Sequence, residues 1–244
     1  MRNVKLTLEY DGTNYAGWQK QNNALTVEGQ LLKAIKRVTG EDVKTIGCSR
    51  TDSGVHAENY IVNFYTDSTI PGDKFMFPLN NALPEDICIT NSEEADLEFH
   101  ARYYTTGKTY CYTILNKEQP SVLYRNYSYR VKEKLDVEAM RKACTYFLGT
   151  HDFEAFKTQG SSTTSSIRTL YDVHIDQEKD IIKIYATGDG FLYNMVRIMV
   201  GLLIEIGKGK KDPEIVLKAI ELKNRTYTKK VAPPQGLMLK KVFY

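Results

Sequence analysis

Short segments in which apolar and polar residues alternate recur along the whole chain, and they limit the fold to one built around sheet. This alternation is typical of a strand with one buried face. The sequence predicts strands over residues 4–10, 59–65, 109–115, 181–186 and 237–243, and shorter extended segments at 87–90, 98–104 and 172–175. The last of these and 181–186 are expected to form a hairpin around residues 177–180.

Segments with helical periodicity lie between these runs. Thr26 is expected to cap a helix that Gly40 closes, and Asp136 to cap one that Gly149 closes. Further helices are expected near 73–82, over 192–206 and from Asp212-Pro213 onward. A loop rich in serine and threonine is expected at 161–166. Because strands and helices do not alternate strictly, the prediction is an α+β fold with largely antiparallel sheet. We expect two similar α/β halves, 1–103 and 104–244, around a central cleft.

Several classes of protein are excluded by what the 244 residues contain. The N-terminus enters a strand pattern at once, which predicts no signal peptide. The longest apolar run, 191–207, carries Asn194, Arg197 and Glu205 and is too polar to span a membrane. Four scattered cysteines form no CxxC pair and no zinc-site spacing, so we expect reduced thiols in a cytoplasmic protein without a metal. No glycine-rich phosphate loop is present.

Charge is distributed unevenly between the two halves. Residues 1–100 hold 9 Lys/Arg and 15 Asp/Glu, a net charge of −6, whereas residues 101–244 hold 24 and 15, a net charge of +9. Aromatic and basic residues interleave at 102–104, 108–112 and 225–230. Cations bind phosphates and rings stack on unpaired bases, so this combination favours an RNA partner held mainly by the second half.

The segment 47–57 concentrates reactive side chains around Asp52. In a strand or tight turn, residues two apart point the same way, so Arg50 is expected to share a face with Asp52 and keep it ionised. A carboxylate held as an anion can serve as a nucleophile, a base or a metal ligand. The alternative is a polar loop with a surface ion pair.

Eight segments that run in order along the chain resemble one family, the tRNA pseudouridine synthase A family. They are Tyr10-Asp11-Gly12-Thr13 with Gly17-Trp18-Gln19, Thr26-Val27-Glu28-Gly29, Arg50-Thr51-Asp52-Ser53-Gly54-Val55-His56-Ala57, Phe99-His100-Ala101-Arg102, Gly107-Lys108-Thr109-Tyr110-Cys111-Tyr112, Gly149-Thr150-His151-Asp152-Phe153, Gly190-Phe191-Leu192-Tyr193-Asn194-Met195-Val196-Arg197 and Pro234-Gln235-Gly236-Leu237-Met238-Leu239.

The resemblance implies a pseudouridine synthase fold and an isomerase that converts uridine to pseudouridine at positions 38, 39 and 40 of the tRNA anticodon stem and loop. It implies Asp52 as the catalytic residue and no cofactor. Among substrate-binding residues, Arg50 would help to flip the target nucleotide and Tyr110 would stack on the uracil. Leu192 would pack against the uracil, and Arg197 would pair with the aspartate. The family resemblance also implies a homodimer that binds tRNA.

Other residues compete for these roles. Tyr112 is placed like Tyr110, and His56 could be a base beside Asp52, although a structural role is preferred. Asp11 is expected to form a turn and Asp152 to order a loop. The chain also departs from the family pattern at Cys48-Ser49 and Ser53, which leaves the backbone conformation of Ser49 open because the family commonly has glycine there.

Two other functions remain as alternatives to an isomerase. An RNA-binding protein without catalysis would need the basic, aromatic second half but not Asp52, Arg50 and Arg197 together. A carboxylate-dependent nucleoside hydrolase would need a second acid near Asp52, and the segment offers none.

Overall fold

The fold is that of a computed structural model, which describes residues 1–158, 160 and 165–244. The chain forms two compact units. The first contains Met1–Thr106 together with Met238–Tyr244, and the second contains Gly107–Leu237. The sequence-based halves, 1–103 and 104–244, differ from these units in one main respect, because the C-terminal strand belongs with the N-terminal part of the chain.

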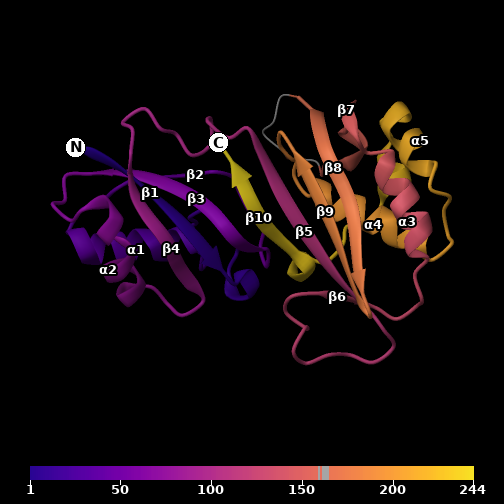
Figure 1. Cartoon of the computed structure of the whole chain (residues 1–244), viewed down its shortest axis with the longest axis horizontal. Helices are drawn as coiled ribbons and strands as arrows, with labels where there is room; N and C mark the ends of the chain where they lie inside the picture. The colour runs from indigo at the N-terminus through magenta and orange to yellow at the C-terminus, as the bar shows by residue number, and fades with distance from the viewer. Residues whose placement is uncertain (159, 161–164) are drawn as a thin grey trace. The chain divides into compact units, whose positions relative to one another are not determined.

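The sheet of the first unit has the strand order β4-β1-β3-β10 (Figure 1). The strands are β1 (Arg2–Tyr10), β3 (His56–Thr66), β4 (Ile87–Ala95) and β10 (Leu237–Phe243). β1 pairs antiparallel with β3 and β4, whereas β10 runs parallel to β3. A short strand, β2 (Thr45–Gly47), pairs with the far end of β3. One edge of β3 is therefore shared, with β10 at its start and β2 near its end.

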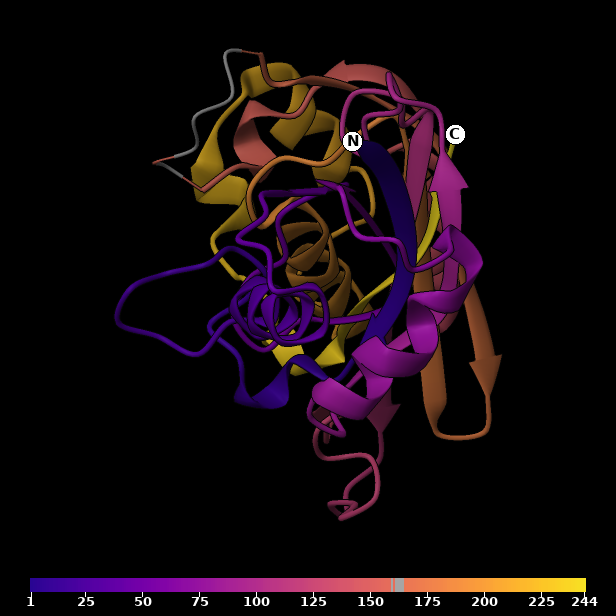
Figure 2. The same ribbon diagram turned by 90° about the vertical axis from the view of Figure 1, so that its left-hand side faces the viewer.

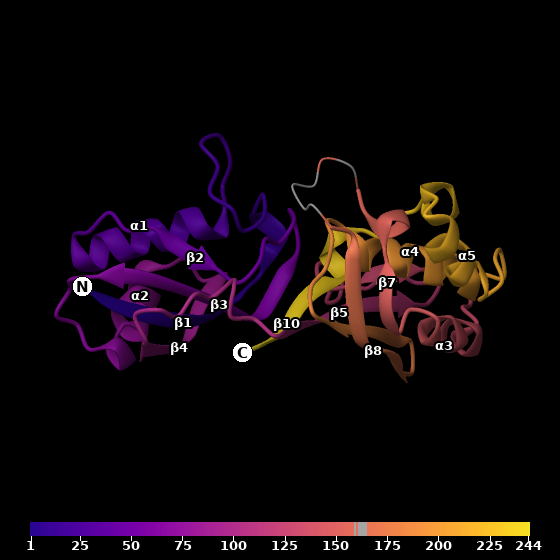
Figure 3. The same ribbon diagram turned by 90° about the horizontal axis from the view of Figure 1, so that it is seen from above.

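The two helices of this unit are α1 (Val27–Thr39) and α2 (Met76–Ala82). The predicted cap of α1 is confirmed, since the side chain of Thr26 accepts a hydrogen bond from the Gly29 N–H and Gly40 ends the helix in the left-handed conformation. α1 runs beside β1, as seen nearly end-on in Figure 2 and lengthwise in Figure 3. It buries Val27, Leu31 and Ile35, which the helical period places on one face.

The sheet of the second unit has the order β5-β9-β8-β7, with β6 beside β5. Its strands are β5 (Gly107–Asn116), β6 (Tyr129–Val131), β7 (Gly149–Asp152), β8 (Ile167–Glu178) and β9 (Ile181–Gly188). All pairs except β5–β6 are antiparallel. The predicted hairpin is confirmed, and its turn places Lys179 at a φ of 53°. The mixed α/β fold with mostly antiparallel sheet therefore agrees with the prediction.

Three helices complete the second unit: α3 (Val137–Thr145), α4 (Met195–Gly207) and α5 (Ile215–Leu222). Asp136 caps α3 as predicted, because its side chain accepts a hydrogen bond from the Ala139 N–H. α3 and α4 pack on each other and against β8 and β5, respectively. α4 is almost entirely buried, which explains why its sequence is apolar. Within the described residues no helix has the length and apolarity needed to cross a bilayer.

The prediction of extended structure over 98–104 is wrong, because this segment forms turns. Two buried asparagines hold it: Asn3 donates to the carbonyl oxygens of Asp96 (2.8 Å) and Phe99 (3.0 Å), and the Asn63 side chain accepts from the Ala101 N–H (2.9 Å). Backbone groups that would pair with a strand are thus bonded to side chains. Of the loop predicted at 161–166, residues 161–164 lie outside the described part of the chain.

Candidate functional site

The loop that carries Asp52 leaves the sheet where β2 ends and returns where β3 begins beside β10. It is short, and its backbone is held to neighbouring segments. The Cys48 N–H donates to the Ile61 carbonyl (2.9 Å), the Trp18 N–H to the Thr51 carbonyl (3.2 Å) and the Gly54 N–H to the Tyr15 carbonyl (3.2 Å). The hydroxyls of Tyr10 and Thr51 lie 2.8 Å apart. The backbone is therefore held to neighbouring segments on both the N-terminal and the C-terminal side of Asp52.

Three buried aromatic rings, those of Tyr10, Trp18 and Tyr60, pack together in this unit. Trp18 stacks on Tyr60 with ring centroids 3.9 Å apart, and Tyr10 lies 5.8 Å from Tyr60. The Tyr60 hydroxyl donates to the Ser49 carbonyl, which ties the loop to the rings. Such packing excludes water and restricts side-chain motion, so the loop has a rigid support.

Two glycines allow the close approach of this loop. A Cβ on Gly12 would lie 2.0 Å from the Val55 carbonyl oxygen, and one on Gly17 would lie 2.4 Å from that of Thr51. Gly17 also has a φ of 92°, which disfavours any side chain. The glycines of the Tyr10–Gln19 region therefore fit against the Asp52 loop, a role that single-sequence reasoning did not assign to them.

Asp52 is half-buried and Arg50 is exposed. The predicted pairing of Arg50 with Asp52 is wrong: no ion pair joins them, and Arg50 has no hydrogen-bond or ionic partner among the described residues. The reason is that residues 48–55 form bends and a turn rather than a strand, so side chains two apart do not share a face. Arg50 presents its guanidinium to solvent.

The unusual neighbours of Asp52 fit the loop without strain. Ser49 is not among the residues with positive φ, so the position does not require glycine. Cys48 is buried with its sulfur 3.8 Å from the Ser49 hydroxyl, and the Ser53 hydroxyl donates to the Tyr15 carbonyl (3.1 Å). Ser53 thus adds an anchor of its own to the loop.

His56 and Asp11 have structural positions. His56 is 1% exposed, and its Nδ1 accepts a hydrogen bond from the Gly12 N–H (3.0 Å). Asp11 accepts from the Thr13 N–H (2.9 Å) and lies 3.1 Å from the same His56 nitrogen. Both contacts of Nδ1 are with the turn that follows β1. His56 holds the turn after β1, which agrees with the preference for a structural role.

Tyr110 and Tyr112 lie on the same face of β5 but have different surroundings. Tyr112 is fully buried, its hydroxyl donates to the Pro233 carbonyl (2.8 Å), and burial raises its pKa well above the ordinary value. Its ring packs so closely on Gly236 that a Cβ there would lie 2.6 Å away. Tyr112 is therefore a core residue. Tyr110 is 7% exposed and meets Phe191 edge-on, with ring centroids 5.1 Å apart.

Leu192 and Arg197 flank the start of α4. Leu192 is buried, next in sequence to the Phe191 ring that contacts Tyr110. Arg197 is partly buried, and its Nε donates to the Ala232 carbonyl (2.8 Å) while its Nη1 donates to the Asn194 side-chain oxygen (2.6 Å). The guanidinium is thus fixed in orientation. Asn194 lies in one of the segments that resemble the family, but the sequence alone predicts no role for its side chain.

Asp152 orders structure, as expected. It pairs with Lys223 (2.8 Å), accepts from the Ser166 hydroxyl (2.5 Å) and from the Glu154 N–H (3.2 Å). Lys223, followed by Ser166, lowers the pKa of this carboxyl. The side chain joins β7 to α5 and to the segment that begins β8.

The aromatic and basic residues at 102–104 lie at the surface. Tyr103 is 77% exposed and stacks on the His100 ring, with centroids 4.1 Å apart, while Arg102 and Tyr104 are also exposed. By contrast, Lys108 is buried. The turn held by Asn3 and Asn63 therefore presents a ring and a cation together, a combination that suits unpaired RNA bases and phosphates.

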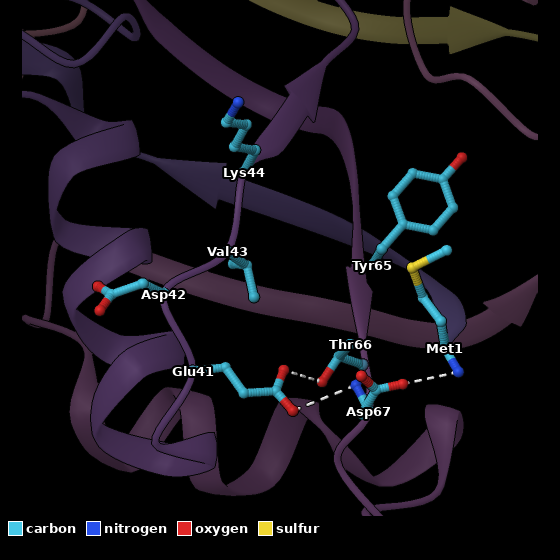
Figure 4. A pocket seen from close by; sticks show the side chains of 8 residues that line it. All are labelled: Met1, Glu41, Asp42, Val43, Lys44, Tyr65, Thr66 and Asp67. Atoms are coloured by element: carbon cyan, nitrogen blue, oxygen red, sulfur yellow. Dashed lines mark hydrogen bonds and ion pairs between the residues drawn. The ribbon is translucent and has the colours of Figure 1, made fainter.

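A hollow of about 460 Å³ lies at the opposite end of β3 from His56, away from the Asp52 loop (Figure 4). Tyr65, Thr66 and Asp67 line it together with Glu41, which accepts hydrogen bonds from the Thr66 hydroxyl and the Asp67 N–H. The Glu41 carboxylate is thus bonded to other residues of the lining. In residues 1–158, 160 and 165–244, no group of three His, Cys, Asp or Glu side chains could hold a metal ion.

Comparison with known proteins identifies relatives over the full chain. A family model described as tRNA pseudouridine synthase matches residues 7–104 and 143–244. The chain is 56% identical to "tRNA pseudouridine synthase A 2" of Clostridium perfringens and 53% identical to "tRNA pseudouridine synthase A" of Clostridium acetobutylicum. Both alignments cover 100% of each chain over 244 residues.

Proposed function

The chain belongs to the tRNA pseudouridine synthase family, and on this premise we propose that it isomerises uridine to pseudouridine in tRNA with Asp52 as the catalytic residue. The catalytic role proposed for Asp52 is supported mainly by the structure of the loop on which it lies. A half-buried carboxylate stands on a backbone anchored by Tyr10, Trp18 and Tyr15, in the segment that resembles the family's catalytic motif.

The reaction breaks the N1–C1′ glycosidic bond, turns the uracil and forms a C5–C1′ bond. The C5 proton is then lost and N1 regains a proton, so atoms and electrons balance without an oxidant, a reductant or an external group. One carboxylate is sufficient chemistry: Asp52 attacks C1′ or C6 as a nucleophile, or accepts a proton as a base. Water must be excluded while the uracil is detached.

The other site residues have complementary roles in the proposal. Arg50, exposed and without an internal partner, occupies the space left by the flipped nucleotide and contacts phosphate. Tyr110 and Leu192 present ring and aliphatic surface to the uracil. Arg197, whose guanidinium orientation is fixed, supplies the positive charge that keeps Asp52 ionised.

The finer features follow from the family resemblance. We propose that the targets are positions 38, 39 and 40 of the anticodon stem and loop, and that the enzyme acts in the cytoplasm as a homodimer without a cofactor. Two similar halves around a central active-site cleft belong to the same proposal. The exposed Arg102 and Tyr103 support contact with RNA outside the target nucleotide.

The test is release of tritium from [5-³H]uridine-labelled tRNA by Asp52→Asn. We expect no detectable release, while the control Asp42→Asn, at an exposed carboxylate that pairs with Lys36, keeps normal activity. Normal release by Asp52→Asn would refute the role of Asp52.

Carbodiimide labelling of the product tRNA separates the alternative functions. Isomerisation leaves the mass of the tRNA unchanged, and the pseudouridine that it forms is then detected by the carbodiimide label. A nucleoside hydrolase would instead release free uracil, and an RNA-binding protein would leave the tRNA unmodified.

A further inference from the structure

Asn194 adopts an unusual backbone conformation for the residue that precedes a helix. Its φ and ψ are 61° and 9°, in the left-handed region, whereas the caps Thr26 and Asp136 are extended. The other two non-glycine residues with positive φ among those described, Lys179 and Lys223, stand in a hairpin turn and at a helix C-terminus. Left-handed backbone is common at such ends but not at a helix start. A sparsely populated conformation at this point calls for a reason.

The side chain of Asn194 does not cap α4, because it makes no hydrogen bond to the helix N–H groups. It bonds instead in two other directions. Its oxygen accepts from Arg197 Nη1 at 2.6 Å, and its Nδ2 donates to the Thr158 hydroxyl at 3.0 Å. The Thr158 N–H in turn donates to the Tyr193 carbonyl (3.2 Å). Thr158 is therefore bonded both to the Asn194 side chain and to the backbone of the residue before it.

Arg197 is thereby held from two sides. Its Nε donates to the Ala232 carbonyl (2.8 Å), while Nη1 is held by Asn194. Because the guanidinium is planar, these two hydrogen bonds together fix its orientation. Rotation of the plane would break the bond of Nε or that of Nη1. The amide of asparagine is suited to this position because it offers an acceptor to Arg197 and a donor to Thr158 in one short side chain.

We propose that Asn194 and Thr158 are positioning residues that set the orientation of the Arg197 guanidinium for the isomerisation. This inference rests on the proposed function, in which Arg197 serves the reaction at Asp52. Neither residue needs to touch the uridine. The left-handed backbone of Asn194 is retained because its side chain then bonds to Arg197 and Thr158.

The first experiment compares Asn194→Gly with the parent enzyme. Glycine adopts a φ of 61° without cost, so the start of α4 is preserved while both side-chain bonds are lost. We expect kcat for tritium release to fall about 10- to 100-fold with KM for tRNA changed less than about 2-fold, because misorientation of a catalytic group affects the chemical step rather than binding. An unchanged kcat, or a rise in KM alone, would overturn the proposal.

A matched pair at Thr158 provides a second, milder test. Thr158→Val removes the acceptor of Asn194 Nδ2 and is expected to lower kcat about 3- to 10-fold, by loss of a single hydrogen bond. Thr158→Ser keeps the hydroxyl and is expected to restore kcat to near the parent value. Equal kcat in the valine and serine variants would contradict the role of the hydroxyl.

The third experiment separates this inference from the proposed function. In an Arg197→Ala background, Asn194→Gly is expected to cause no further loss of kcat, because residues that act through one group are not additive. An equal further loss would show that Asn194 does not act through Arg197 and would overturn the inference. Parent-level kcat in Arg197→Ala alone would instead refute the role of Arg197 in the proposed function, whatever the outcome at Asp52.

Discussion

The hydroxyl groups of Tyr10 and Thr51 lie 2.8 Å apart in the buried interior of the first unit. This contact joins the end of β1 to the residue that directly precedes Asp52, so the position of the carboxylate depends on the first strand of the chain.

Tyr10→Phe is expected to lower the free energy of unfolding by about 1–2 kcal/mol, because it leaves the buried Thr51 hydroxyl without this partner. Activity should fall as well, since Thr51 is adjacent to Asp52. Denaturant unfolding and tritium release measure the two effects. The control is Tyr65→Phe, which removes a bond to the Leu97 carbonyl near the surface and should change both quantities little. Similar losses in the two variants would contradict the importance of the Tyr10–Thr51 contact.

Gly17→Ala should be more disruptive than Gly40→Ala, although both glycines have positive φ. A Cβ at Gly17 meets the Thr51 carbonyl oxygen at 2.4 Å, whereas nothing lies within 4 Å of a Cβ at Gly40. We expect Gly40→Ala to cost about 1 kcal/mol for its backbone conformation alone. Gly17→Ala should cost about 2 kcal/mol more and reduce activity, because the Asp52 loop must move. Thermal unfolding of both variants checks this order, and equal costs would rule out the close approach as the reason.

Substitution of the two tyrosines of β5 should separate stability from activity. Tyr112→Phe loses the bond to the Pro233 carbonyl and is expected to destabilise the protein by about 1 kcal/mol with normal kcat. Tyr110→Phe is expected to lower kcat at least about 10-fold, because we propose that the Tyr110 hydroxyl assists the transfer of the C5 proton. The reverse pattern would exchange the roles of the two residues.

The pair of Asp152 and Lys223 should make stability depend on acid. Lys223 and Ser166 hold the pKa of Asp152 below its usual range. The ion pair therefore stabilises the fold above the ordinary aspartate pKa, and this stabilisation is lost as the pH falls through the lowered value. Asp152→Asn should cost about 1 kcal/mol at pH 7, and the difference from the parent should vanish near pH 2. A constant difference across this range in thermal unfolding would contradict the assignment.

Elements whose signals are local could be predicted well from the sequence. The caps Thr26 and Asp136, the end of α1 at Gly40 and the hairpin before residue 181 all appear as expected, because each depends on residues within one or two turns of chain. The prediction of extended structure at 98–104 is wrong, since hydrogen bonds of this segment go to Asn3 and Asn63, which are distant in sequence. The short strands β2, β6 and β7 were also missed, because three or four residues carry too little periodicity.

The sequence by itself determined the chemical groups of this protein: one carboxylate in a turn, a cation beside it, and the tyrosines and arginines that make it similar to its family. Tertiary structure decided how these groups are held. In the folded chain Arg50 does not pair with Asp52, and Tyr112 is buried in the core. β10 lies beside β3, where Met238 pairs with His56. The Arg197 guanidinium is held by the Asn194 side chain. Periodicity reports only which face of an element is buried. Which distant backbone or side chain satisfies a given polar group follows from packing of the folded chain, and no local pattern encodes it.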